Sequence, residues 1–301
     1  MRRTSFLIVV AAFLSAAIAA SCSRGRPPET SDQKTSAAAD EGTALQVDRE
    51  WIVALEESDT VAAGALLDPE FEWTNTEGQT RGGSESLETL AALLADLQGE
   101  TDVETYDYGH VSVITSARPE ARLMRVWALR PGGWRALTVI STALAAGTTP
   151  FAAAGSEVAG DCDNPCRTMP YAPTTETEKT LTGLFQQLKV DEWHPNPERW
   201  APYVLDGVDY VTATAQLSKA ARVAHLTALE EAGAPSAPGD PVVSMRIVDL
   251  GDAAVMRARH TTYRGGVPYY SVRVWAFRDD RWQLANTQQT VIEYGLGSET
   301  Q

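Results

Sequence analysis

Two stretches of the chain alternate apolar and polar residues on either side of a tight turn, as paired antiparallel strands do. These stretches are RVWALRPGGWRALTVISTAL (125–144) and RVWAFRDDRWQLANTQQTVI (273–292), and they are identical at seven of 20 aligned positions. Leu67-Asp68-Pro69 and Leu205-Asp206-Gly207 form an earlier pair in the same order. Repeated segments in a constant order predict a duplicated unit.

Apolar residues at helical spacing precede the strands in both copies. In copy one they predict a helix from Leu45 to about Ser58 and a second over 87–97, with strands from Val103 to Ala143. In copy two they predict helices over 177–190 and 216–232. Helices first and strands afterwards predict an α+β fold, with the helices packed on a curved antiparallel sheet. The predicted boundaries are 1–21 for a signal peptide, 22–43 for a disordered tether, 44–145 for domain 1, 146–177 for a linker, 178–295 for domain 2 and 296–301 for a tail.

The N-terminus has the pattern of an export signal. Arg2 and Arg3 precede an apolar run over 6–20 that is shorter than the roughly 20 residues a membrane span needs. Small residues before Cys22 are similar to a bacterial lipobox, which implies lipidation of that cysteine. Cleavage near Ala20 without lipidation is the alternative. We therefore expect an exported, lipid-anchored protein of the cell envelope, in the outer membrane facing the periplasm if the source has two membranes.

The two remaining cysteines, Cys162 and Cys166, lie in a turn-forming segment of the linker. In an oxidising compartment such a pair predicts a disulfide. Because the closed loop is short, we expect the bridge to stiffen the linker more than it holds the fold. No further ligands that would form a metal site stand nearby, so we expect no metal there.

The formal net charge is −15. Such a balance argues against nucleic acid and anionic membrane surfaces as partners. Apart from the membrane reached through the lipid, the expected partners are a small molecule or an envelope protein. No cofactor is expected.

The chain resembles the NTF2-like (cystatin-like) superfamily, specifically its SnoaL / DUF4440 group, which includes relatives of ketosteroid isomerase. The resemblance is carried by a helix closing on Glu57-Ser58-Asp59, by Ala65–Phe71, and by the closing hairpin at 125–135 that recurs at 273–283. It implies cone-shaped domains with an apolar pocket, which can pair through their sheets inside one chain. It does not imply one activity, because this fold hosts isomerases, dehydratases and binding modules.

Acid–base chemistry on this fold needs a base facing a donor in an apolar cavity. The candidates are His260 and Asp209 in copy two, with Glu70 or Glu72 in copy one. His260 is expected in a strand that pairs with the strand beginning at Tyr269, half-exposed, and Asp209 in a loop. The other histidines, His110, His194 and His225, are assigned to a strand start, a loop and a polar helix.

Several aromatic residues are candidates for lining a pocket, although aromatic side chains lie mostly in cores. They are Trp73, Tyr106, Trp127, Tyr210, Tyr270 and Trp275. The sequence favours a non-enzymatic protein that binds a small apolar or amphipathic ligand or an envelope partner. The alternatives are a lyase or isomerase of the SnoaL or ketosteroid-isomerase type acting in domain 2, and a purely structural interaction module.

Overall fold

The computed structural model describes residues 43–144, 161–212, 215–234, 236, 238–261 and 268–292. The predicted signal peptide, Cys22, nearly all of the tether and the tail lie outside these residues. No helix within the described ranges is both long and apolar enough to span a membrane.

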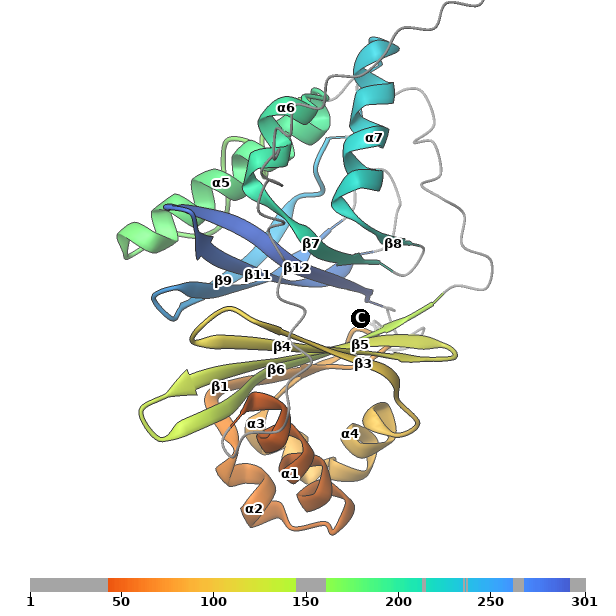
Figure 1. The fold of residues 1–301 in the computed structure, drawn as a ribbon, viewed down its shortest axis with the longest axis vertical. Coiled ribbons are helices and arrows are strands. Elements are labelled where there is room, and N and C mark those ends of the chain that lie inside the picture. Colours follow the sequence, from red (N-terminus) through yellow and green to blue (C-terminus); the bar gives the residue numbers. More distant parts are fainter. Residues whose placement is uncertain are drawn as a thin grey trace, which may run out of the picture. The chain divides into compact units, whose positions relative to one another are not determined.

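The first half of the chain folds into four helices and a six-stranded sheet, called domain 1 below (Figure 1). Its elements are α1 (Ala44–Glu56), α2 (Thr60–Ala65), β1 (Leu67–Thr74), β2 (Thr80–Gly82), α3 (Gly83–Glu88), α4 (Leu90–Leu97), β3 (Thr101–Asp107), β4 (Val111–Arg118), β5 (Ala121–Arg130) and β6 (Gly133–Ala143).

The second half repeats this arrangement as domain 2. Its elements are α5 (Glu176–Trp193), α6 (Pro197–Trp200), the 3₁₀ turn η1 (Ala201–Tyr203), β7 (Val204–Val211), β8 (Gln216–Leu217), α7 (Lys219–Glu231), β9 (Val242–Asp249), β10 (Ala253–His260), β11 (Tyr269–Arg278) and β12 (Arg281–Val291). The predicted α+β class and the order of elements in both copies are confirmed.

The two sheets have equivalent strand orders, β2-β1-β6-β5-β4-β3 and β8-β7-β12-β11-β10-β9. The predicted antiparallel pairing holds for all neighbouring strands except one pair in each sheet, since β1 with β6 and β7 with β12 run parallel. Parallel neighbours need a long crossover connection. Two helices and four strands lie between β1 and β6 and supply this connection, and one helix and four strands do so between β7 and β12.

Side-chain caps set the starts of three helices. Thr43 accepts a hydrogen bond from the backbone of Gln46 at α1, Thr175 from Glu178 at α5, and Ser218 caps α7 in the same way. Such caps satisfy backbone N–H groups that have no partner within the helix.

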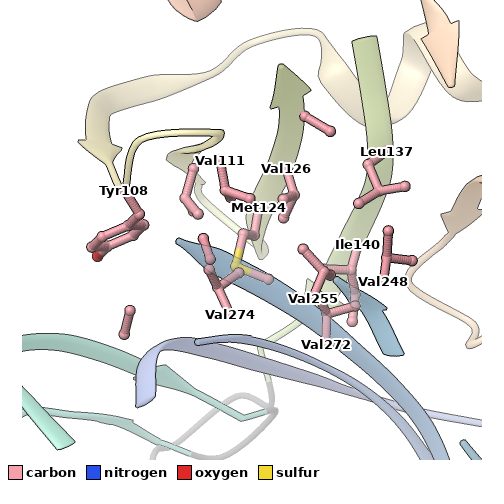
Figure 2. Packing of buried hydrophobic residues seen from close by; sticks show 14 of the residues in the cluster. Tyr108, Val111, Met124, Val126, Leu137, Ile140, Val248, Val255, Val272 and Val274 are labelled. Atoms are coloured by element: carbon pink, nitrogen blue, oxygen red, sulfur yellow. The ribbon is translucent and has the colours of Figure 1, made fainter. Parts of the chain in front are cut away.

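One face of each sheet is covered by helices, and the other face is apolar. Val126, Met124 and Ile140 of domain 1 belong to one core cluster with Val272 and Val274 of domain 2 (Figure 2). At its margins polar groups bridge the two domains. Tyr108 Oη donates to Asn286 Oδ1 (2.8 Å), Tyr270 Oη donates to Glu72 Oε2 (2.6 Å), and Gln288 Nε2 donates to the carbonyls of Arg122 (2.8 Å) and Ile140 (3.0 Å).

The predicted disulfide between Cys162 and Cys166 is present, and both cysteines are buried. Its loop contacts domain 2 directly: the Asn164 side chain donates to the carbonyl of Val242 and accepts from its N–H, each at 2.9 Å. The loop therefore caps the start of β9, which goes beyond the predicted role of stiffening a linker.

Candidate functional site

The two catalytic candidates of copy two lie on opposite faces of the domain 2 sheet. His260 ends β10, where it pairs with Tyr269 and contacts Phe185 of α5. Asp209 lies in β7, not in a loop as predicted, and lines a cleft of about 200 Å³ between the two sheets. The structure therefore does not bring these two side chains together as an acid–base pair.

The expectation that His260 is half-exposed is wrong, since only 1% of its surface is accessible. Its ring stacks on Tyr269 with centroids 4.4 Å apart. Its Nδ1 lies 3.2 Å from the Asp240 carbonyl and its Nε2 3.2 Å from Ser271 Oγ. Burial, helped by the charge of Arg273, holds the pKa of His260 well below its ordinary value, so the ring is neutral.

The carboxylates proposed for copy one serve the contact between the domains. Glu70 pairs with Arg246 at 2.6 Å, and Glu72 lies 3.4 Å from the buried Arg257. Both acids therefore meet cations of domain 2.

Five of the six candidate pocket aromatics are distributed over three clusters of buried residues, and Tyr210 belongs to none of them. Trp73 and Trp127 lie in the core of domain 1, and Trp275 in that of domain 2. Tyr106 and Tyr270 belong to the apolar layer between the sheets. Tyr210, in β7, accepts a hydrogen bond from Gln289 at 3.4 Å. These side chains do not converge on one common pocket.

The repeated Arg-Val-Trp motif places an arginine and a tryptophan on the helix-covered face of each sheet. In domain 1, Arg125 Nε donates to Asp48 Oδ1 at 2.7 Å, and Trp127 Nε1 donates to the same oxygen at 3.0 Å. A second carboxylate, Glu100, pairs with Arg125 Nη1. Burial alone lowers the pKa of Arg125, but the charges of Asp48 and Glu100 outweigh it and raise that pKa. One internal carboxylate oxygen thus satisfies both residues of the motif.

The helix that supplies Asp48 has a counterpart in domain 2 with the same spacing of buried residues. These residues are Ala44, Asp48, Trp51, Ala54 and Leu55 in α1, and Leu181, Phe185, Leu188, Asp191 and Glu192 in α5. Phe185 therefore occupies the position of Asp48. The apolar ring cannot accept the hydrogen bonds that the carboxylate accepts in domain 1.

The arginine of domain 2 is consequently buried without a carboxylate partner within the described residues. Arg273 is 2% exposed, donates to Ser271 Oγ at 2.7 Å, and places its guanidinium 4.7 Å from the Phe185 ring centroid. Its Nη2 has no hydrogen-bond partner, and neither do Trp275 Nε1 or the Thr287 hydroxyl. Thr287 is the cross-strand neighbour of Arg273, and Trp275 lies two residues further along the same strand, so the three residues are neighbours on the buried sheet.

The acidic side chains near Arg273 form hydrogen bonds with other residues. Glu192 accepts from Lys189 at 2.7 Å and from Trp200 at 3.2 Å. Asp240 hydrogen-bonds Tyr269, and burial, assisted by that acid, raises the pKa of the Tyr269 hydroxyl well above its ordinary value. The part of the chain that the structure describes contains no cluster of three or more metal-ligating side chains. The arrangement offers hydrogen-bond donors and positive charge, which suit an anionic group.

Sequence reasoning did not single out Arg273, although the repeat contained the signal. The Arg-Val-Trp motif is the same in both copies, whereas the helix position that faces it carries Asp48 in one and Phe185 in the other. Finding that difference required the helices to be aligned, and their sequences share too little to do so.

No protein-family model matches the chain, and no curated protein matches it. Several solved structures are similar to part of it. An NTF2-like protein from Cytophaga hutchinsonii is 15% identical with a TM-score of 0.29, covering 33% of this chain and 94% of its own. An NTF2-like protein of unknown function from Pseudomonas putida is 13% identical with a TM-score of 0.32, covering 40% and 89%. A protein of unknown function with a cystatin-like fold from Nostoc punctiforme is 13% identical with a TM-score of 0.33, covering 40% and 95%.

These similarities concern the fold alone. The described chain contains one architecture twice, a six-stranded mixed sheet with helices on one face, as expected from the resemblance to the NTF2-like superfamily. The assignment to the SnoaL / DUF4440 group stays a prediction.

Proposed function

We propose that this chain is an exported, lipid-anchored binding protein in which domain 2 holds a small amphipathic molecule and domain 1 is a closed structural partner. The proposal rests chiefly on one difference between the copies. The buried Arg-Trp pair is satisfied by one internal carboxylate in domain 1, whereas Arg273 Nη2 and Trp275 Nε1 have no hydrogen-bond partner in domain 2.

Energetics support a ligand in domain 2. A buried charge without a partner costs several kcal/mol, and each buried polar atom without a hydrogen bond costs about 1–3 kcal/mol. Arg273 is offset only in part, by the Ser271 hydroxyl and the Phe185 ring. A bound molecule that satisfies these donors would recover that free energy as affinity.

The surroundings of Arg273 favour a ligand with an apolar body. Trp275 and the side chains of α5 and β10 around it form a buried apolar cluster, to which Phe185 and Met256 belong. Apolar surroundings with a few placed polar groups are the composition typical of small-molecule sites.

A thermal-shift screen of the full-length protein against small amphipathic molecules tests the binding role. We expect ligands that raise the melting temperature, and we expect Arg273→Met to abolish that rise. The matched control is Arg257→Met, since Arg257 is equally buried in the same sheet but contacts Glu70 and Glu72 of domain 1. Ligands should still raise the melting temperature of this control variant, even if its melting temperature without ligand is lower than that of the wild type. Ligands that stabilise wild type and Arg273→Met alike would place the site elsewhere.

The anchoring proposal rests on the sequence around Cys22. Metabolic labelling with a palmitate analogue should tag the wild type, and Cys22→Ser should lose the label. Label retained in Cys22→Ser, or a wild-type protein found free in the cytoplasm, would contradict lipid anchoring.

A further inference from the structure

The geometry of domain 1 serves as a template for the missing partner in domain 2. There a single carboxylate oxygen, Asp48 Oδ1, accepts from both the arginine and the tryptophan of the motif. In domain 2 the same two residue types stand at the same strand positions, and Trp275 Nε1 and Arg273 Nη2 have no acceptor. The equivalent helix position holds an apolar ring.

The local charge agrees with an anion as the missing group. Among the described residues no acidic side chain lies within ion-pair distance of Arg273. Lys189, also near Phe185 at 5.7 Å, is already paired with Glu192. His260 is neutral and adds no charge. The group that completes this site should therefore carry one negative charge.

The number of donors favours a carboxylate over a larger oxyanion. Two N–H groups and the hydroxyl of Thr287 remain unsatisfied, which matches the two oxygens of a carboxylate. Arginine binds planar carboxylates through its fork of N–H groups. A phosphate has additional oxygens that also need donors. Among the described side chains of the surrounding apolar cluster, no further donor without a partner is present for them.

We propose that domain 2 binds a small monocarboxylate with an apolar body, whose carboxylate takes the place of the Asp48 side chain and accepts hydrogen bonds from Arg273 and Trp275. This inference rests on the proposed binding role of domain 2 and names its ligand class. The Phe185 ring, which now lies over the guanidinium, must turn aside to admit the carboxylate.

Titration calorimetry with matched pairs of probes tests the ligand class. Hexanoate and benzoate should bind the full-length protein at one site, and hexanamide and benzamide should bind at least about tenfold more weakly, a difference of about 1.4 kcal/mol. Inorganic phosphate should not compete. Equal binding of acid and amide would overturn the carboxylate assignment while leaving a binding role intact. Binding that survives Arg273→Met unchanged would overturn both.

A second test introduces a carboxylate into domain 2 by substitution, and its deciding measurement, the melting temperature, needs no added ligand. Phe185→Asp should supply what Asp48 supplies in domain 1 and should abolish hexanoate binding. The matched control is Leu188→Asp, one turn further along the same buried face. Phe185→Asp should melt about 5 °C or more above Leu188→Asp, because only the first aspartate meets an arginine. Equal destabilisation by the two aspartates would overturn the inference, and the melting temperatures decide this whether or not either variant binds ligand.

Discussion

The substitution Asp48→Leu removes the carboxylate on which the comparison of the two domains depends. The side chains of Asp48 and Arg125 are each 2% exposed, and the leucine fills a similar space without accepting hydrogen bonds. The change removes the bonds from Arg125 Nε (2.7 Å) and Trp127 Nε1 (3.0 Å), and it leaves a buried cation facing an apolar side chain.

The expected loss follows from those contacts. Breaking a buried ion pair by removing one partner costs about 3–5 kcal/mol. Glu100 still pairs with Arg125 after the change, so we expect the lower end, about 3 kcal/mol. For a chain of this size that corresponds to a fall of about 6–12 °C in melting temperature.

Urea unfolding with linear extrapolation measures the loss. The double variant Asp48→Leu/Arg125→Met should regain at least half of it, because replacing both partners of a buried pair by apolar residues is often neutral. A loss below about 1 kcal/mol for Asp48→Leu would refute the reasoning. In that case a buried arginine of this fold would be satisfied without the carboxylate on α1, and Arg273 would imply no ligand.

Three further predictions concern pH, the disulfide and the contact between the domains. Because the pKa of His260 is depressed in the folded state, the unfolded chain takes up a proton below about pH 6.5 that the folded chain does not, so stability should fall there by up to about 1.4 kcal/mol per pH unit. Denaturant titrations at pH 7, 6 and 5 should show that the free energy of unfolding of His260→Gln depends less on pH than that of the wild type. An identical pH dependence would mean that other groups cause the loss of stability. Removing the disulfide by Cys162→Ser/Cys166→Ser should lower stability by about 2 kcal/mol, and Asn164→Ala with the bridge intact should reproduce part of this loss by undocking the loop from Val242. Fragments 34–150 and 161–301 should bind a hydrophobic dye when separate and lose it on mixing, because the apolar layer between the sheets becomes covered; dye binding that mixing does not change would contradict the sheet-to-sheet contact.

The sequence predicted the duplication and the order of elements because both follow from the local spacing of apolar residues. Apolar spacing in α1 and α5 and alternation in the strands depend on neighbours within a few residues. The two tryptophans of each closing hairpin recur in register, so the repeat was visible without a structure. The disulfide was predictable for the same reason, since its two cysteines stand four residues apart.

The tertiary structure alone decided which side chains meet. The parallel pairing of β1 with β6, the burial of His260 and the strand position of Asp209 depend on contacts between residues far apart in the sequence. Asp48 and Arg125 lie 77 residues apart, and no local pattern marks them as partners. Whether a buried arginine has a counter-charge depends on which helix residue packs over its strand. Only the packing shows that Asp48 and Phe185 lie over equivalent arginines of the two sheets.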